Sequence, residues 1–170
     1  MGTVYWITGL SGAGKTTIGS LFFEKMKAEY PNTVFFDGDM LRNAFGNDLG
    51  YSEEERRKCA MRYSRLCKLL QEQDINVICC TISMFDEIRD WNRHNINNYM
   101  EIYVKVPMKI LHERNQKGLY SAAKNGIDND VAGIQVEAEL PKNPDLVLEN
   151  DGSITPEKQV EIIFSKGVLQ

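Results

Sequence analysis

A glycine-rich loop near the start of the chain has the residue types and the spacing to bind the phosphates of a nucleotide. Residues 9–16 read GLSGAGKT, which fits the pattern G-x-x-x-x-G-K-[ST]. Glycines let the backbone turn tightly, so that successive N–H groups can point at one anion. Lys15 can reach the β- and γ-phosphates, and the hydroxyl of Thr16 can ligate a Mg²⁺ ion that bridges the same oxygens. The predicted ATP-binding residues of the loop are Gly9, Ser11, Gly12, Ala13, Gly14, Lys15, Thr16 and Thr17.

The segments on either side of the loop are those that such a site needs. Residues 3–8 are β-branched and aromatic, as in a buried strand. Apolar residues recur at helical spacing after the loop, which predicts a helix over 15–29. The amino terminus of that helix would lie under the phosphates and add its partial positive charge. We therefore expect a strand, the phosphate loop and a helix in this order.

Strands and helices alternate along the rest of the chain. We expect an α/β fold of the P-loop NTPase type, a three-layer sandwich with a five-stranded parallel sheet and a lid, in a single domain over 1–170. The lid is residues 115–143, a polar stretch too long for an ordinary connection. Asp37-Gly38-Asp39 is expected to end the second strand. The predicted strands are 3–8, 33–37, 76–82, 101–106 and 146–148, and the predicted helices are 15–29, 52–73, 85–97, 108–114 and 156–165.

Composition excludes several classes of partner. The net charge is −4 and the pI is about 5.3, which argues against binding to nucleic acid or to an anionic membrane. No apolar run approaches the length of a membrane span, and the amino terminus has the pattern of a core strand. The four cysteines have neither zinc-site nor thioredoxin-type spacing, so we expect small buried residues and reduced thiols. A cytoplasmic location is expected.

Polar residues at the ends of the predicted strands can complete the site. Asp37, Asp39 and Ser83 follow two strands, and ligands of parallel sheets bind beyond the carboxyl ends of the strands. Asp39 could accept the proton of an attacking hydroxyl or help to order Mg²⁺ through water, and Asp37 could support it. The chain lacks the N-K-x-D signature of GTPases. A short chain with a long lid favours a kinase of small molecules, which must exclude water.

Several motifs resemble those of the adenylyl-sulfate (APS) kinase family over nearly the whole chain. They are Asp37-Gly38-Asp39 with Arg42, the run DLGYS at 48–52 with Arg56, Ile82-Ser83, the run KGLY at 117–120, and the run NPDLVL at 143–148. The resemblance implies Mg²⁺ and ATP as phosphoryl donor, the 3′-hydroxyl of a nucleotide ribose as acceptor, and a homodimer.

The resemblance also implies roles for individual residues. Arg42 and Arg56 would hold the acceptor nucleotide, Lys117 would close over the transferring phosphoryl group as a catalytic residue with Lys15 and Asp39, and Arg114 would stack near the ATP adenine. Ser83 matches a serine with a phosphoacceptor role in some members, although we interpret it as a hydroxyl that lines the site. The implied acceptor-binding residues are Asp37, Asp39, Arg42, Tyr51, Arg56, Cys59, Ile82, Ser83, Lys117, Gly118, Leu119 and Val131.

The departures from the family pattern lie on the acceptor side. Asp86 stands where the family has an arginine, Cys59 where it has an asparagine, and Val131 where it has a phenylalanine that stacks on the acceptor adenine. Loss of that ring removes about 1–3 kcal/mol of stacking, and the new carboxylate should repel a doubly charged phosphosulfate tail. We therefore expect the same reaction on another nucleotide, as in the members that phosphorylate cytidine diphosphoramidate for bacterial capsules.

Three alternatives remain open at this point. The first is phosphorylation of adenylyl sulfate itself. The second is a regulatory module that binds nucleotides without kinase activity, although Lys15, Thr16, Asp39 and Lys117 are all present. The third is a kinase of small polyols or sugar acids, which leaves the DLGYS and KGLY runs unexplained.

Overall fold

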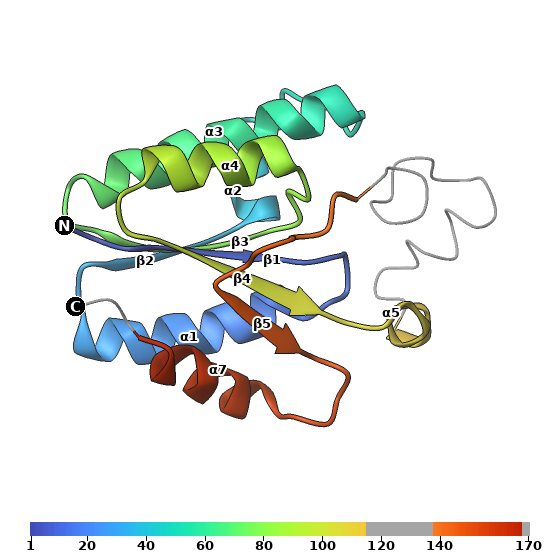
Figure 1. Cartoon of the computed structure of the whole chain (residues 1–170). Coiled ribbons are helices and arrows are strands. Elements are labelled where there is room, and N and C mark those ends of the chain that lie inside the picture. The colour runs from blue at the N-terminus through green and yellow to red at the C-terminus, as the bar shows by residue number, and fades with distance from the viewer. Residues whose placement is uncertain (115–137, 168–170) are drawn as a thin grey trace.

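The fold is a parallel sheet between two layers of helices, as the sequence predicted (Figure 1). The computed structural model describes residues 1–114 and 138–167. The strands pair in the order β2-β3-β1-β4-β5, and all four pairings are parallel. Their bounds are β1 Val4–Thr8, β2 Thr33–Asp37, β3 Asn76–Thr81, β4 Tyr99–Lys105 and β5 Leu146–Glu149.

The helices cover both faces of the sheet (Figure 1). Helices α1 (Lys15–Glu29) and α7 (Pro156–Ser165) lie on one face. Helices α2 (Gly38–Ala44), α3 (Glu53–Gln71) and α4 (Asp86–Asn95) lie on the other. Helix α5 (Met108–Arg114) lies beyond the end of β4. The part of the chain that the structure describes contains no helix long and apolar enough to cross a membrane.

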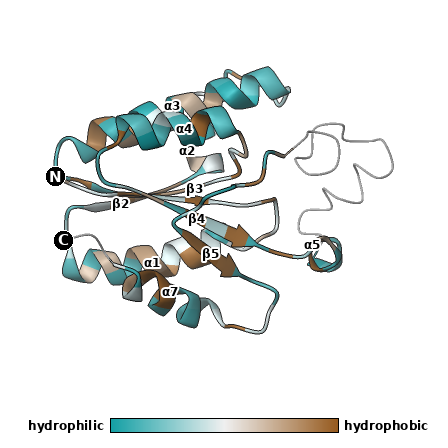
Figure 2. Ribbon diagram, in the orientation of Figure 1, coloured by the Kyte–Doolittle hydropathy of each residue, from teal (hydrophilic) through white to brown (hydrophobic). Residues whose placement is uncertain are grey.

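Strand β1 divides the core between the two layers. Because successive side chains of a strand point to opposite faces, Tyr5 and Ile7 pack with α1, whereas Val4 and Trp6 pack with α3 and α4. All four side chains are fully buried. Hydrophobic residues, in brown, lie in the strands and along α1 and α7 (Figure 2). The central strand is thereby fixed on both sides, and it carries the phosphate loop at its carboxyl end.

One helix differs from the prediction. We expected Asp37-Gly38-Asp39 only to end a strand, but α2 begins directly at Gly38. The carboxylate of Asp37 is its amino-terminal cap and accepts a hydrogen bond from the Met40 amide at 2.8 Å. Helix α2 is too short to show a helical period in the sequence. The helix predicted from residue 52 is α3, and a capping box formed by Ser52 and Glu55 starts it.

Part of the predicted lid lies outside the described residues. These are 115–137, and they include Lys117, Gly118, Leu119 and Val131. The single domain and the lid over 115–143 stay predictions. The second described part of the chain begins at Ala138. The amide of the next residue, Glu139, donates a hydrogen bond to the Met84 carbonyl at 3.0 Å.

Candidate active site

The phosphate loop joins β1 to α1 and requires glycine at its last turn. Gly14 precedes the first residue of α1 and has φ 94°, in the left-handed region. A Cβ atom at this position would lie 2.6 Å from the side-chain nitrogen of Asn150. A side chain at position 14 would therefore strain the backbone and displace the side chain of Asn150.

Asn150, which follows the outermost strand β5, holds the phosphate loop in place. Its side-chain nitrogen donates a hydrogen bond to the Ala13 carbonyl at 2.8 Å, and its backbone amide donates to the Lys105 carbonyl at 2.9 Å. Arg114 donates to the Asn150 carbonyl at 2.9 Å, which places this predicted ATP residue beside the loop. We did not predict Asn150. The available signal was its position directly after β5, at the same edge as Asp37 and Ser83.

Lys15 lies under the loop in a buried setting. Its side chain is 9% exposed, and its ammonium group donates to the Leu10 carbonyl at 2.8 Å. Burial lowers the pKa of Lys15 to about 8, while the neighbouring Cys80 opposes this shift. A buried cation that has lost its hydration and has only a neutral carbonyl as partner is stabilised when a polyphosphate binds next to it. Lys15 is thus suited to capture phosphate.

The oxygen groups near the loop are suited to Mg²⁺. The side chains of Thr16 and Thr17 are exposed at the start of α1. Mg²⁺ prefers oxygen ligands and is commonly held by one or two protein groups together with substrate phosphates. Within 1–114 and 138–167, no group of three or more His, Cys, Asp and Glu side chains is arranged to hold a metal ion. The Thr16 hydroxyl and the exposed Asp39 carboxylate are suited to hold a Mg²⁺ ion together with the phosphates of the substrate.

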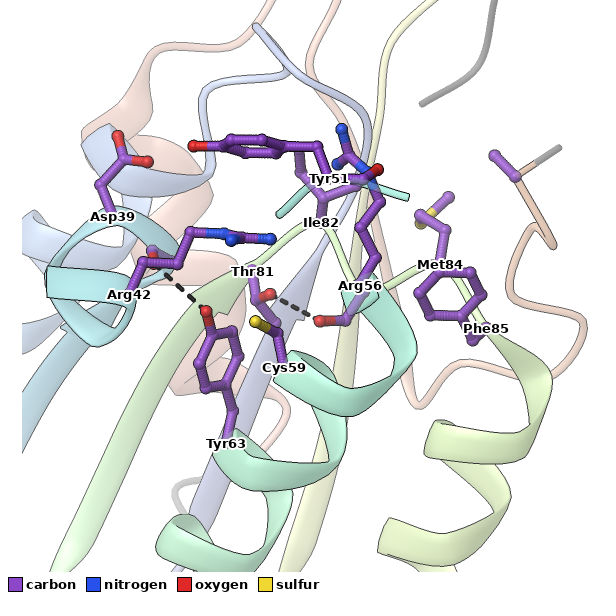
Figure 3. Close-up of a pocket in the computed structure, with 13 residues that line it drawn as sticks. Asp39, Arg42, Tyr51, Arg56, Cys59, Tyr63, Thr81, Ile82, Met84 and Phe85 are labelled. Carbon is purple, nitrogen blue, oxygen red and sulfur yellow. Dashed lines mark hydrogen bonds between the residues drawn. The ribbon is translucent and has the colours of Figure 1, made fainter. Parts of the chain in front are cut away.

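A pocket opens at the carboxyl end of β3, between α2 and α3 (Figure 3). Seven of the twelve residues expected to bind the acceptor line it, although the sequence separates them by up to 44 positions. Asp37 caps α2 behind it, and the other four lie outside the described residues. The residues that line the pocket are Gly38, Asp39, Arg42, Tyr51, Arg56, Cys59, Tyr63, Thr81, Ile82, Ser83, Met84, Phe85 and Ala138.

Two guanidinium groups flank the aromatic ring of Tyr51 at the rim of the pocket. The central carbon of the Arg42 guanidinium lies 4.3 Å from the ring centre, and that of Arg56 lies 5.3 Å from it. Arg42 also donates to the Leu49 carbonyl at 2.9 Å, and Arg56 donates to the Tyr51 carbonyl at 2.7 Å. The Tyr51 side chain is 53% exposed. This rim offers an aromatic face and two cations, which suits a base and phosphate groups.

The floor of the pocket is polar but carries no formal charge. The Tyr63 hydroxyl donates a long hydrogen bond, 3.5 Å, to the Gly38 carbonyl, and burial raises the pKa of Tyr63 well above its usual value. The hydroxyl groups of Thr81 and Ser83 lie 2.6 Å apart (Figure 3). Cys59 also lines the pocket and is 7% exposed. Tyr63, Thr81, Met84 and Phe85 carry no local sequence pattern, so we did not predict them.

The structure weakens the electrostatic argument from Asp86. Asp86 is not among the residues that line the pocket. Its carboxylate pairs with Lys142 at 2.6 Å and with the buried Arg89. The Lys142 hydrogen bond contributes most to lowering the pKa of Asp86. Because two cations accompany this carboxylate, its repulsion of a substrate tail should be weaker than we expected.

Comparison with known proteins gives concordant matches along the chain. The sequence model of the adenylylsulphate kinase family matches residues 1–149. A cytidine diphosphoramidate kinase from Campylobacter jejuni subsp. jejuni serotype O:2 is 42% identical over 166 residues, which are 98% of this chain and 96% of that protein. An adenylyl-sulfate kinase from Halothermothrix orenii is 36% identical over an alignment of 171 positions, which covers 99% of this chain and 92% of that protein.

A solved structure extends the match to three dimensions. The APS kinase of Mycobacterium tuberculosis, solved in complex with AMPPNP and APS, has a TM-score of 0.88 to this chain at 30% identity. The alignment covers 97% of this chain and 96% of that one. The sheet order and both helical layers therefore have a close experimental counterpart.

Proposed function

Because this chain belongs to the adenylylsulphate kinase family, we propose that it transfers a phosphoryl group from ATP to the ribose 3′-hydroxyl of cytidine diphosphoramidate. The relatives are kinases, so the chain is a phosphotransferase with a hydroxyl acceptor and ATP as co-substrate. The identity of the nucleotide acceptor and the roles of single residues are part of the proposal.

The observation that carries the proposal is that the phosphate loop and the pocket lie at the carboxyl ends of two neighbouring strands. The phosphate loop follows β1, and the pocket with Arg42, Tyr51 and Arg56 opens at the end of β3, the strand that pairs with β1. Asp39 lines that pocket. A donor nucleotide on the loop and an acceptor nucleotide in the pocket would meet at one edge of the sheet, as in-line transfer requires.

The proposed chemistry assigns one task to each group. The 3′-oxygen attacks the γ-phosphorus, the bond to the β–γ bridging oxygen breaks, and ADP leaves. Asp39 accepts the hydroxyl proton, Lys15 holds the donor phosphates, and Lys117, outside the described residues, adds positive charge during transfer. Bound Mg²⁺, held by Thr16 with water-mediated help from Asp39, would supply charge neutralisation for the phosphates.

Cytidine diphosphoramidate is preferred to adenylyl sulfate as acceptor for two reasons. A full-length relative with that name is 42% identical, against 36% for the adenylyl-sulfate kinase of H. orenii. Cys59 and Val131 also replace an amide and an aromatic ring on the acceptor side, and a pyrimidine needs a smaller stacking surface. Adenylyl sulfate is the second candidate, supported by the family model and by the M. tuberculosis structure.

An acceptor assay tests the proposal. The purified protein is supplied with ATP, Mg²⁺ and either acceptor, and the 3′-phosphorylated product is identified by ³¹P NMR. We expect a higher kcat/KM for cytidine diphosphoramidate. A higher value for adenylyl sulfate would select the second candidate, and ATP binding without turnover of either acceptor would favour a regulatory module.

We also propose a homodimer in the cytoplasm that serves capsule biosynthesis. The family resemblance supports the dimer and the capsular role. The four cysteines are free and buried, which suits a reducing compartment. Light scattering on the purified protein tests the dimer, because a monomer mass at micromolar concentration would contradict it.

A further inference from the structure

We propose that Glu139 is a positioning residue that holds one wall of the acceptor pocket in place. This apolar wall consists of Met84, Phe85 and Ala138. Met84 and Phe85 are almost fully buried. The kinetic consequence of the inference rests on the proposed function, whereas its structural consequence does not.

The backbone of Glu139 joins the wall to α4. Its amide donates to the Met84 carbonyl at 3.0 Å, and its carbonyl accepts a hydrogen bond from Arg89 at 2.5 Å. Arg89 is buried and also pairs with Asp86 at the start of α4. These two bonds hold Ala138, the residue before Glu139, next to Met84. They join segments that are far apart in the sequence, since Asp86 and Glu139 are 53 positions apart.

The side chain of Glu139 holds the wall from a second direction. One carboxylate oxygen accepts a hydrogen bond from the Arg57 guanidinium at 2.8 Å, and the other accepts from the backbone amide of Asp86. The same guanidinium lies over the Phe85 ring, with its central carbon 4.3 Å from the ring centre. One carboxylate therefore connects α3, the first residue of α4 and the aromatic member of the wall.

Charge favours this arrangement. Burial opposes ionisation of Glu139, but the hydrogen bonds from Asp86 and Arg57 outweigh it and lower the pKa of the carboxyl group. Glu139 is therefore an anion at neutral pH, and both of its side-chain hydrogen bonds are charge-assisted. None of the atoms bonded to Glu139 belongs to the phosphate loop, residues 9–16. Its removal should therefore affect the acceptor more than ATP.

The chain offers a matched control. Glu53 pairs with the same Arg57 guanidinium at 2.9 Å, one turn earlier on α3, whereas the Asp86 amide donates to Glu139. Replacement of Glu53 weakens the ion pairing of Arg57 and leaves the bond from the Asp86 amide to the Glu139 carboxylate in place, whereas Glu139→Ala removes it. The backbone bond between Glu139 and Met84 stays in both variants. A difference in acceptor KM between the Glu139 and Glu53 variants therefore measures the effect of the wall and not the effect of the ion pairing of Arg57.

The experiment compares Glu139→Ala, Glu139→Gln and Glu53→Gln with the parent protein. The KM values for cytidine diphosphoramidate and for ATP are measured together with kcat, and thermal unfolding is followed for each protein. We expect Glu139→Ala to raise the acceptor KM about tenfold through the loss of two charge-assisted hydrogen bonds, with the ATP KM within about twofold. Glu139→Gln, which keeps an oxygen acceptor, should fall between Glu139→Ala and the parent, and Glu53→Gln should match the parent.

Amide hydrogen exchange by NMR provides a test without turnover. Exchange at the Asp86 amide should speed up in Glu139→Ala and not in Glu53→Gln. An unchanged acceptor KM in Glu139→Ala, with only a lower melting temperature or kcat, would overturn the positioning role. Unchanged exchange at Asp86 would overturn the structural basis of the inference. If the parent phosphorylates neither acceptor, the proposed function fails, and the exchange experiment still decides whether Glu139 holds the wall.

Discussion

The side-chain nitrogen of Asn150 donates a hydrogen bond to the carbonyl oxygen of Ala13 across 2.8 Å, from the end of β5 to the phosphate loop. The two residues are 137 positions apart in the sequence. The shape of the loop thus depends on the last strand of the sheet as well as on its own glycines. Nucleotide affinity should therefore respond to Asn150, which carries no charge and need not touch phosphate.

Replacement of Asn150 tests this dependence. Asn150→Ala leaves the Ala13 carbonyl without its buried donor, and we expect ATP to bind about fivefold to tenfold more weakly. Asn150→Asp should weaken binding further, because a carboxylate would face the carbonyl and the bound phosphates. Calorimetric titration with a non-hydrolysable ATP analogue measures the Kd. An unchanged Kd in both variants would show that the loop keeps its shape without this bond.

The pKa of Lys15 predicts proton uptake on ATP binding. In the free protein burial lowers this pKa from 10.5 to about 8, and bound phosphates should raise it again. Below about pH 8 the amine already carries its proton, so affinity should depend little on pH. Between about pH 8 and the pKa of the complex, binding must take up a proton, so affinity should fall as the pH rises.

Calorimetry in two buffers of different ionisation enthalpy measures this uptake. At pH 8.5 the apparent binding enthalpy should differ between the two buffers. That difference, divided by the difference in the ionisation enthalpies of the buffers, should correspond to the uptake of a fraction of one proton. Lys15→Met should bind the analogue weakly and without this difference. Equal enthalpies for the parent protein in both buffers would contradict the lowered pKa.

The Tyr63 hydroxyl should contribute to acceptor binding. Its hydrogen bond to the Gly38 carbonyl is long, at 3.5 Å, so a polar group of the acceptor can compete for it. Tyr63→Phe keeps the ring, which is stacked on Phe45 with centroids 6.2 Å apart, and removes only the hydroxyl. We expect the acceptor KM to rise about threefold to tenfold, with the ATP KM unchanged. Tyr99→Phe, which removes a hydroxyl outside the pocket lining, is the control, and equal acceptor KM values in both variants would refute the contact.

Asp86 should affect stability and not the choice of acceptor. Asp86→Asn leaves the buried Arg89 with less compensation, and we expect a loss of about 1 kcal/mol in the free energy of unfolding. The ratio of kcat/KM values for cytidine diphosphoramidate and adenylyl sulfate should stay within about twofold of the parent ratio. Urea unfolding and the acceptor assay measure the two effects. A marked shift of the ratio toward adenylyl sulfate would restore the electrostatic role that the structure argues against.

Local pattern was sufficient for much of the fold. The phosphate loop, the capping box at Ser52 and Glu55 and the alternation of strands and helices are each encoded within a few residues, and all three appear in the structure. The strand ends then predicted which polar groups would meet. Asp39 and Ser83, 44 residues apart, line the same pocket.

Contacts between distant segments could not be predicted in this way. Asn150 acts through a partner 137 positions away, and Glu139 acts through partners at least 50 positions away. Only the position of Asn150 directly after a strand marks it in the sequence. Tyr63 reads as one more apolar position of α3. The ion pairs of Asp86 could not be predicted either, because Lys142 and Arg89 come near it only in the folded chain. Burial and pairing of charges are properties of the tertiary structure.

The most direct test of the account is the transfer itself. The parent protein and Lys15→Ala are each incubated with ATP, Mg²⁺ and cytidine diphosphoramidate, and formation of the 3′-phosphorylated nucleotide is followed by ³¹P NMR. We expect the parent to form this product with a higher kcat/KM than for adenylyl sulfate, and Lys15→Ala to form it at least about a hundredfold more slowly. Equal rates for the two proteins, or no 3′-phosphorylated product from either acceptor with the parent, would contradict the account.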